Sequence, residues 1–354
     1  MAENTINETL NIEERPSLGK SISFAVYFTA KRCNPNGDPL AGNQARQDPL
    51  TFKGYVTAEC IKNKLRKRLM WMQQPVLVQP DSHPYRDTYS CVNNRAKAVL
   101  TGDTYKDIMA QAKAADKAAE KTAEKGDKKA KEVTCGVQTR KAILSKEFTD
   151  VRMFGCTIAE SGMPTSVIGP ITMGSAYSID VVRPIPYQLT KSTNGTEPKK
   201  GKTTGTDDAG DTAEAAADAK SSDTMGFRER IDFGLYEFVG GVTPETARAT
   251  GLTYEDMELF KQALIHLFDG DETTARPAGS MEVCKIVWWE SEGMEGMSTA
   301  KLARTIHVEK KPGIEDPHSY ADYKFTFFDV DGKPEVDQNV CTLPGEKREI
   351  IELY

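Results

Sequence analysis

The 354-residue chain lacks the features that mark membrane, secreted and metal-binding proteins. No stretch approaches the roughly 18 consecutive apolar residues that a bilayer-spanning helix needs, and residues 1–14 are polar and acidic, unlike a signal peptide. The seven cysteines form no C-x-x-C pair, and the four histidines lack ligand spacing. We therefore expect a cytoplasmic protein with reduced thiols, no membrane contact, no metal site and no cofactor.

Motifs of nucleotide and acyl-transfer chemistry are also missing. The sequence has no Walker loop, no G-x-G-x-x-G that opens a helix, and no G-x-S-x-G elbow. The formal net charge of −6 argues against nucleic-acid binding over the whole surface. Much of the acidity lies in residues 1–14 and 207–223, so local surfaces can still be positive. With 38% hydrophobic residues, the chain is long enough to bury a full core.

The most informative segment is the loop NPNGDP over residues 34–39, which extends to Asn43 and Arg46. Its two prolines fix φ, and its asparagine and glycine residues favour tight or left-handed turns. We expect the short polar side chains of this loop to be free to bind a ligand. A plain surface turn is the alternative, because such dipeptides mark turns in many proteins.

A strand and a basic helix flank this loop. Residues 21–30 alternate apolar and smaller or polar side chains, which predicts a half-buried strand. Thr57 can cap a helix whose buried stripe is Ile61, Leu65 and Leu69. The other faces of that helix are then expected to carry the cations, with Lys62 and Arg66 in one row and Lys64 and Arg68 in another. Such a charged face is either merely solvated or a cradle for phosphates.

The remaining pattern predicts further elements separated by low-complexity tracts. Residues 105–132 read as an exposed helix, and residues 188–225 are too polar to fold by themselves. Strands are expected over 169–182, 231–239 and 281–289, with helices over 253–268 and 298–306. The core order is therefore strand, helix, strand, strand, helix, strand. This order predicts an α+β fold with the split βαβ plan of ferredoxin-like and RNA-recognition-motif (RRM) domains.

Seven motifs, in register over about residues 20–305, resemble one known family. The chain is similar to the backbone subunit of the type I-C (Dvulg subtype) CRISPR effector complex, Cascade, in the RAMP superfamily. The motifs that carry the resemblance are residues 34–39 with 41–43, 56–66, 150–155, 169–171, 224–226, 234–236 and 275–276.

The resemblance implies an RRM-like palm with a finger-like helical insertion and a thumb. Several copies would form a helical filament along one CRISPR RNA (crRNA), and each thumb would kink the guide so that bases stay exposed for pairing with target DNA. Further implied partners are the crRNA-processing, large and small subunits of Cascade. The implied division is a flexible arm (1–19), a palm (20–74, 148–187 and 226–354), fingers (75–147) and a thumb or flexible tract (188–225).

A filament must hold any guide sequence, so its contacts are expected on phosphate, ribose and stacked bases. The 188–225 tract is more acidic than the family leads us to expect, so we place RNA contact at its two ends. Met225 or Phe227 could supply an apolar wedge between bases. The expected RNA-binding residues are Asn34, Asn36, Gly37, Asn43, Arg46, Lys62, Arg66, Thr224, Met225 and Arg228.

Two other functions remain open from the sequence. The first is an endoribonuclease that uses Asp38, because type III backbone subunits cut target RNA with an aspartate after the first strand. The second is a structural oligomer that binds no nucleic acid. We expect no enzyme activity, since Asp38 is well explained as a turn residue.

Individual residues also have structural alternatives. Asp150 and Phe154 are expected to be fold elements. Trp288 and Trp289 must face opposite sides of a strand, so one is expected in the core, and the other is expected to stack or to pack on a neighbouring subunit. Arg276 binds either RNA or the helix end at residues 269–272.

Overall fold

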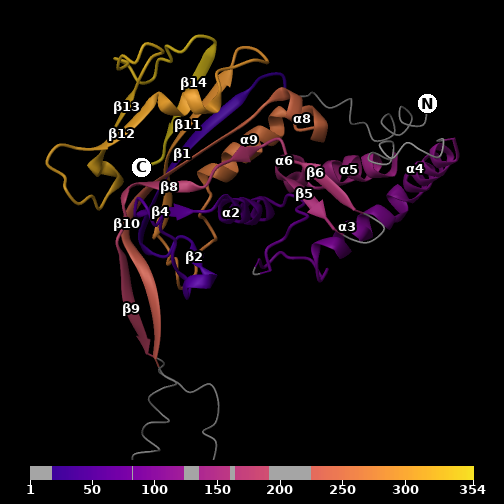
Figure 1. Cartoon of the computed structure of the whole chain (residues 1–354), viewed down its shortest axis with the longest axis horizontal. Coiled ribbons are helices and arrows are strands. Elements are labelled where there is room, and N and C mark those ends of the chain that lie inside the picture. Colours follow the sequence, from indigo (N-terminus) through magenta and orange to yellow (C-terminus); the bar gives the residue numbers. More distant parts are fainter. Residues whose placement is uncertain (1–17, 82, 123–134, 160–163, 191–224) are drawn as a thin grey trace, which may run out of the picture.

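The computed structural model describes residues 18–81, 83–122, 135–159, 164–190 and 225–354. Its main sheet has eight strands, all paired antiparallel, in the order β14-β11-β1-β10-β8-β4, with β7 and β9 also paired to β10 (Figure 1). The expected combination of helices and a sheet in one fold is confirmed. The strands are β1 (Ile22–Cys33), β4 (Lys53–Val56), β7 (Thr172–Met173), β8 (Ala176–Val181), β9 (Pro184–Thr190), β10 (Met225–Val242), β11 (Met281–Ser291) and β14 (Glu346–Glu352).

Helices α2 (Ala58–Trp71) and α9 (Tyr254–Ile265) pack on one face of this sheet. Thr57 caps α2 by accepting a hydrogen bond from the Cys60 amide at 3.2 Å, and Ile61, Leu65 and Leu69 are buried, as predicted. Helix α9 begins with a complete capping box between Thr253 and Asp256. The shorter carboxylate therefore does the work that glutamate usually does at this position.

Strand β1 is buried on both faces, so the expectation of a half-buried strand was wrong. Phe24, Val26 and Phe28 belong to the core cluster beneath α2 and α9, whereas Ala25 and Tyr27 belong to a second cluster on the opposite face. That face is covered by α10 (Thr299–Arg304) and by the hairpin of β12 (Ile306–Lys310) and β13 (Tyr323–Phe327). The small or polar residues of the alternation thus pack against a second layer instead of facing water.

The same two layers correct the expectation for the tryptophan pair. Trp288 and Trp289 do face opposite sides of β11, but each is only 1% exposed. Trp288 stacks on Phe24 with ring centroids 5.8 Å apart, and Trp289 lies in the second cluster. Both are therefore core residues.

A separate helical lobe stands beside the sheet (Figure 1). Its own hydrophobic cluster runs from Leu77 to Val167 and includes Tyr105, Met109 and Ala112. The described part of the helix expected over 105–132, residues 105–122, is therefore buried along one side instead of fully exposed, whereas residues 123–134 lie outside the described part of the chain. The lobe continues beyond residue 147. The elements of the lobe are α3 (Val92–Thr101), α4 (Asp103–Thr122), α5 (Cys135–Glu147), α6 (Thr149–Phe154), β5 (Gly155–Ile158) and β6 (Thr165–Ile168); α8 (Pro244–Thr250) follows β10.

The single long strand expected over 169–182 is instead two short strands, β7 and β8. Between them the Gly174 amide donates to the Val239 carbonyl at 3.0 Å, so the chain stays alongside β10 through the break. The Ser175 hydroxyl accepts a hydrogen bond from the Ala58 amide at 3.3 Å, at the start of α2. The break in the strand therefore helps to seat the basic helix.

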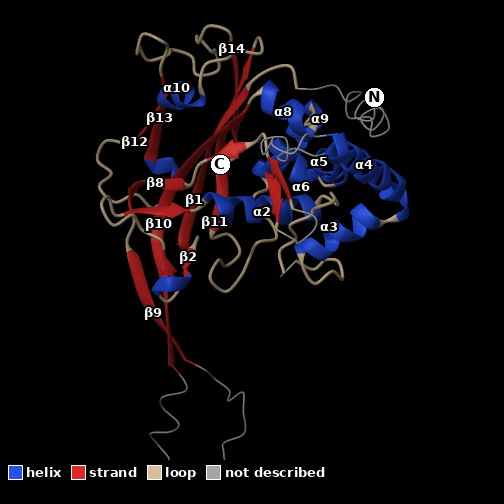
Figure 2. Ribbon diagram, turned by 45° about the vertical axis from the view of Figure 1, so that its right-hand side comes forward, coloured by secondary structure: helices blue, strands red, loops and turns tan. Residues whose placement is uncertain are grey.

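Strand β10 is much longer than the expected 231–239. Its first half pairs with β9 from Pro184↔Ile231 to Thr190↔Met225, and Figure 2 shows this two-stranded arm projecting away from the body. The two ends of the 188–225 tract thus lie in paired strands. Residues 191–224, including the predicted contact Thr224, lie outside the described part of the chain.

None of the seven cysteines, all of which lie in the described part of the chain, forms a disulfide bond. Within the residues that the structure describes, no helix is both long and apolar enough to cross a membrane.

A half-buried carboxylate on β10, Glu237, generates a pH prediction. The Tyr27 hydroxyl donates to Glu237 at 2.5 Å, and burial raises the pKa of Glu237 despite that bond and nearby Lys53. A raised folded-state pKa means that the carboxyl group stabilises the fold below its unfolded pKa, and that this stabilisation is lost as pH rises through the folded pKa. Glu237→Gln keeps an acceptor for Tyr27, so it should stabilise the protein at pH 7, with the gain fading towards pH ~4.

Urea unfolding of both proteins across this pH range measures the difference in free energy. Glu282→Gln, at an exposed position of β11, is the matched control and should change stability by no more than about 0.5 kcal/mol at any pH. A Glu237→Gln protein that is less stable than the wild type at pH 7 would contradict the assignment.

Candidate nucleic-acid interface

The NPNGDP loop is held by its own polar side chains, which corrects the expectation that they are free. Asn34 is 4% exposed and donates from Nδ2 to the Asn43 carbonyl at 2.8 Å. Asn36 accepts a hydrogen bond from the Thr57 amide at 2.9 Å and so ties the loop to the start of α2. The loop contains β2 (Gly37–Asp38), the 3-10 helix η1 (Pro39–Ala41) and β3 (Gln44–Ala45). These amides therefore shape the interface, and their contact with RNA stays a prediction.

A Cβ at Gly37 would collide with the Asn43 side chain, so any other residue at this position would force Asn43 to move. Asn43 itself has a positive φ of 64°, a conformation that asparagine tolerates better than most residues. Gly37 therefore packs closely within the loop, and its contact with RNA stays a prediction. Asn43 remains exposed at the surface.

Arg46 lies at the base of the loop and is oriented by two neighbours. Its Nη1 is 3.3 Å from the Tyr55 hydroxyl and 3.5 Å from the Asp38 carboxylate, and its guanidinium lies 5.9 Å from the centre of the Tyr55 ring. The bond to Tyr55 and the charge of Asp38 raise the pKa of Arg46. Arg46 is therefore a fixed cation that keeps 22% of its side chain exposed.

Most cations of α2 are neutralised by partners from distant segments, which the sequence did not indicate. Lys64 is buried against Asp271, and Lys67 and Arg276 also bind this carboxylate, at 2.8 and 3.1 Å. Burial alone would raise the pKa of Asp271, but Lys64 and Arg276 lower it below its usual value. The expectation that Lys64 lies on a solvent face was wrong, and Arg276 takes the structural alternative of binding a carboxylate at 269–272.

Arg66 is likewise engaged, at 3.1 Å from Asp150. Asp150 is fully buried and also accepts the amides of Leu77 and Val78, which confirms its expected role as a fold element. Lys62 has no ion pair among the described residues. Burial and the charge of Arg66 lower its pKa. Of the predicted row of Lys62 and Arg66, only Arg66 therefore has an ion pair among the described residues.

The arm carries a second group of cations beside an aromatic ring. Arg228 pairs across the strands with Tyr187 and is exposed, and the Arg230 guanidinium lies 4.1 Å from the centre of the Tyr187 ring. Because side chains alternate along a strand, this face is opposite to the one with Phe227, which is 75% exposed. Met225 begins β10, and its side chain is outside the described set.

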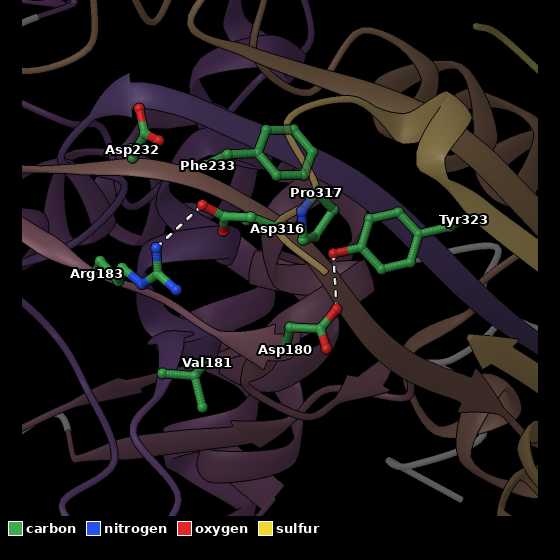
Figure 3. A pocket seen from close by; sticks show the side chains of 9 residues that line it. Asp180, Val181, Arg183, Asp232, Phe233, Asp316, Pro317 and Tyr323 are labelled. Atoms are coloured by element: carbon green, nitrogen blue, oxygen red, sulfur yellow. Dashed lines mark hydrogen bonds and ion pairs between the residues drawn. The ribbon is translucent and has the colours of Figure 1, made fainter. Parts of the chain in front are cut away.

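Two hollows flank the root of the arm. One is a cavity of about 320 Å³ between the loop and the arm, lined by Asp38, Ala41, Gln44, Ala45, Arg46, Gln47, Tyr55, Pro184 and Glu229. The other, drawn in Figure 3, is about 30 Å³ and has room for little more than a water molecule. In it Tyr323 donates to Asp180 at 2.8 Å and Arg183 pairs with Asp316 at 3.0 Å (Figure 3). Its carboxylates make it unsuited to a polyanion.

Residues 20–328 match the family described as CRISPR-associated protein Cas7. The chain belongs to the Cas7 family. The CRISPR-associated identity expected from the motifs is thereby confirmed, whereas the type I-C subtype stays a prediction.

The Cas7-family chain is similar to a curated relative and to solved structures. It is 25% identical over 247 residues to the CRISPR-associated protein Cas7 of Haloferax volcanii, covering 68% of this chain and 62% of that relative. A chain of a "CRISPR RNA-guided surveillance complex, pre-nicking" has a TM-score of 0.40 at 14% identity, over 76% of this chain and 75% of that one. A chain of the "Type III-B Cmr-beta bound to cognate target RNA" has a TM-score of 0.34 at 12% identity, over 80% and 63%.

Sequence reasoning missed Arg230, Tyr187 and Tyr55 in this Cas7-family protein. The alternating R-x-R at 228–230 was the available signal, because period-two charge on an extended segment indicates a strand face. Because the strand was expected to begin at residue 231, residues 228–230 were not considered as part of a strand face. No local signal pointed to Asp271, whose cationic partners on α2 are about two hundred residues away.

The Asp271 cluster generates a stability prediction. Asp271→Asn leaves Lys64, with a side chain only 2% exposed, without a counter-charge, so the free energy of unfolding should fall by about 3–5 kcal/mol. The folded-state pKa of Asp271 is lowered, so its stabilisation is present above the unfolded pKa of ~3.9 and is lost as pH falls through the folded pKa. The deficit of the variant should therefore shrink in acid.

Chemical denaturation at pH 7 and at acidic pH measures both effects. Asp269→Asn is the matched control, because its pair with His266 is exposed on both sides and should contribute less than about 1 kcal/mol. Equal losses from the two substitutions would refute the buried cluster as a stabilising unit.

Proposed function

We propose that this protein is the non-catalytic backbone subunit of a type I-C Cascade. Copies of it oligomerise along a crRNA, bind its sugar–phosphate backbone and present its bases for pairing with target DNA in antiviral defence. The observation that carries the proposal is the projecting arm of a Cas7-family chain, on which Arg228 and Arg230 flank Tyr187. Cations beside an aromatic ring suit a single strand held without regard to sequence.

The strand order supports an RRM-like palm. Strands β1, β8, β10 and β11 are the four strands of the split βαβ plan, with α2 before the second and α9 before the fourth. In the sheet they lie in the order fourth, first, third, second. On this assignment the helical lobe corresponds to the fingers, and the β9–β10 arm corresponds to the thumb.

The polar chemistry fits contact with backbone instead of base edges. Arg46 lies in the loop before α2, Lys62 lies within α2, and Arg228 lies on the arm, so three separate segments supply cations. Phosphate contacts of this kind fix a strand in register but do not read its sequence. Phe227, exposed on the arm, is suited to act as the apolar wedge. The crRNA-processing, large and small subunits would complete the complex.

A charge-removal experiment tests the thumb. The protein is co-expressed with a CRISPR array, purified, and compared by its ratio of absorbance at 260 and 280 nm. The wild type should carry RNA, and Arg228→Gln with Arg230→Gln should carry less. Two lost phosphate contacts should also reduce the slope of log affinity against log salt by about 1.4.

The matched control is Lys301→Gln with Arg304→Gln, which removes the same charge from the exposed side of α10. It should leave both readouts unchanged. A wild-type protein that carries no RNA after co-expression with the CRISPR array would contradict the proposed function.

The endoribonuclease remains the second candidate because Asp38 lies 3.5 Å from the Arg46 guanidinium and lines the larger cavity. Against it, Asp38 accepts the Leu40 amide at 3.1 Å and thereby caps η1. We expect no cleavage when guide-loaded protein is incubated with complementary RNA and a divalent metal. Evenly spaced cuts that disappear in Asp38→Ala would overturn the non-catalytic assignment.

A further inference from the structure

Strand β14 lies at one end of the main sheet, where it pairs with β11. The Leu353 amide donates to the Cys284 carbonyl at 2.9 Å, and this bond fixes which residues of β14 face β11 in the antiparallel ladder. Alternate residues bond to β11, and the amides and carbonyls of Arg348, Ile350 and Glu352 point away from it. Within the described part of the chain, no segment bonds these outward groups.

The main chain of this edge is accessible. The Arg348 side chain is 0% exposed beside Glu335, yet the residue as a whole is partly exposed, so its exposed atoms belong to the main chain. Two exposed apolar side chains border the strand, those of Leu353 and of Val340, whose carbonyl accepts a hydrogen bond from Arg348 at 3.1 Å. Unpaired main-chain groups beside exposed apolar side chains form a surface that another β-strand can extend.

The strand at the other end of the sheet order, β4, has a covered outer edge. The Tyr55 amide donates to the Arg46 carbonyl at 3.1 Å, and the Lys53 carbonyl accepts the Asp48 amide at 2.8 Å. The loop that precedes β4 thus occupies the groups that a further strand would need. Of the two end strands of this sheet, a second copy of the chain can therefore offer only its own β14.

Two copies of β14 are complementary when they run antiparallel about a two-fold axis at Ile350. This register sets Ile350 opposite Ile350 of the second copy and Arg348 opposite Glu352 of the second copy, so outward main-chain groups meet in hydrogen-bonded pairs. Apolar and oppositely charged side chains then face each other, as they do in stable strand pairs. Glu349, which would lie diagonally across from its own copy, is already paired with Lys261 at 2.9 Å.

We propose that β14 is an interaction surface for a second copy of this chain, which adds its own β14 in antiparallel orientation about a two-fold axis. Such a contact uses the same patch on both copies and closes on itself, so it cannot propagate a filament. It therefore goes beyond the proposed function, whose filament needs a head-to-tail contact. Because few residues of each copy take part, the dimer is weak and depends on concentration.

Disulfide trapping tests the register. The full-length protein is expressed without a CRISPR array, freed of residual RNA by nuclease and high salt, and carries Cys91→Ser to remove its exposed thiol. In the proposed dimer the two Cα atoms at position 350 lie about 5.5 Å apart, which is within disulfide range. Under mild oxidation, Ile350→Cys should therefore convert most of the 39.1-kDa chain into a species of twice that mass on a non-reducing gel.

The matched control is Lys347→Cys, at a more exposed position of the same strand. In the proposed register the two copies of residue 347 are separated by about 20 Å along the strands, so this variant should stay monomeric. Crosslinking of Lys347→Cys that equals or exceeds that of Ile350→Cys would indicate random collision and overturn the inference.

A proline substitution tests the same contact without a covalent bond. The amide that Ile350→Pro removes points away from β11, so the circular dichroism spectrum should be retained while pairing between copies is lost. Light scattering of the RNA-free wild type should show a molar mass that rises above 39.1 kDa with concentration, and Ile350→Pro should show a smaller rise.

A wild-type protein that stays monomeric at every concentration, or one whose rise in mass Ile350→Pro leaves unchanged, would refute the β14 contact. If the proline variant does not fold, the comparison of the two cysteine variants decides alone. RNA carried by the wild type in the charge-removal experiment would leave the proposed function standing in either case.

Discussion

The positions of the NPNGDP loop and of the β9–β10 arm both depend on the burial of β1 from both sides. Two hydrophobic clusters meet across this strand, one beneath α2 and α9 and one beneath α10 and the β12–β13 hairpin. Such close packing on both faces leaves β1 no freedom to shift in register. Its carboxyl end therefore delivers the NPNGDP loop to a fixed place, and its neighbour β10 extends from the same core into the arm.

The two faces of the β9–β10 arm carry different kinds of side chain. The N-terminal part of β10, up to Ile231, lies outside the core and pairs with β9. The alternation of side chains along this part places Arg228 and Arg230 on one face and Phe227 and Glu229 on the other. One face therefore offers cations beside Tyr187. The other offers an apolar side chain next to the cavity.

The positive charge of the protein is concentrated in particular elements. The chain is acidic overall, yet α2 is cationic, and most of its cations are held by buried carboxylates, Asp271 and Asp150. These pairs lock α2 against the 271–276 segment and against the helical lobe. Lys62 has no ion pair among the described residues, and Arg46 keeps 22% of its side chain exposed beside Asp38, so the candidate interface has fewer free cations than the run alone indicates.

The local elements could be read from the sequence because each has a local cause. The caps at Thr57 and Thr253, the buried stripe of α2 and the NPNGDP turn all follow from residues within a few positions of one another. The motif pattern also led to the correct family.

Only the tertiary structure determined the contacts between side chains that are distant in the sequence. Three features depend on segments over one hundred residues apart in the sequence. They are the pairing of Lys64 with Asp271, the burial of Tyr27, and the position of Tyr55 and Glu229 around one cavity. Alternation indicates that a strand has two faces, but only the second layer of packing determines that both are buried.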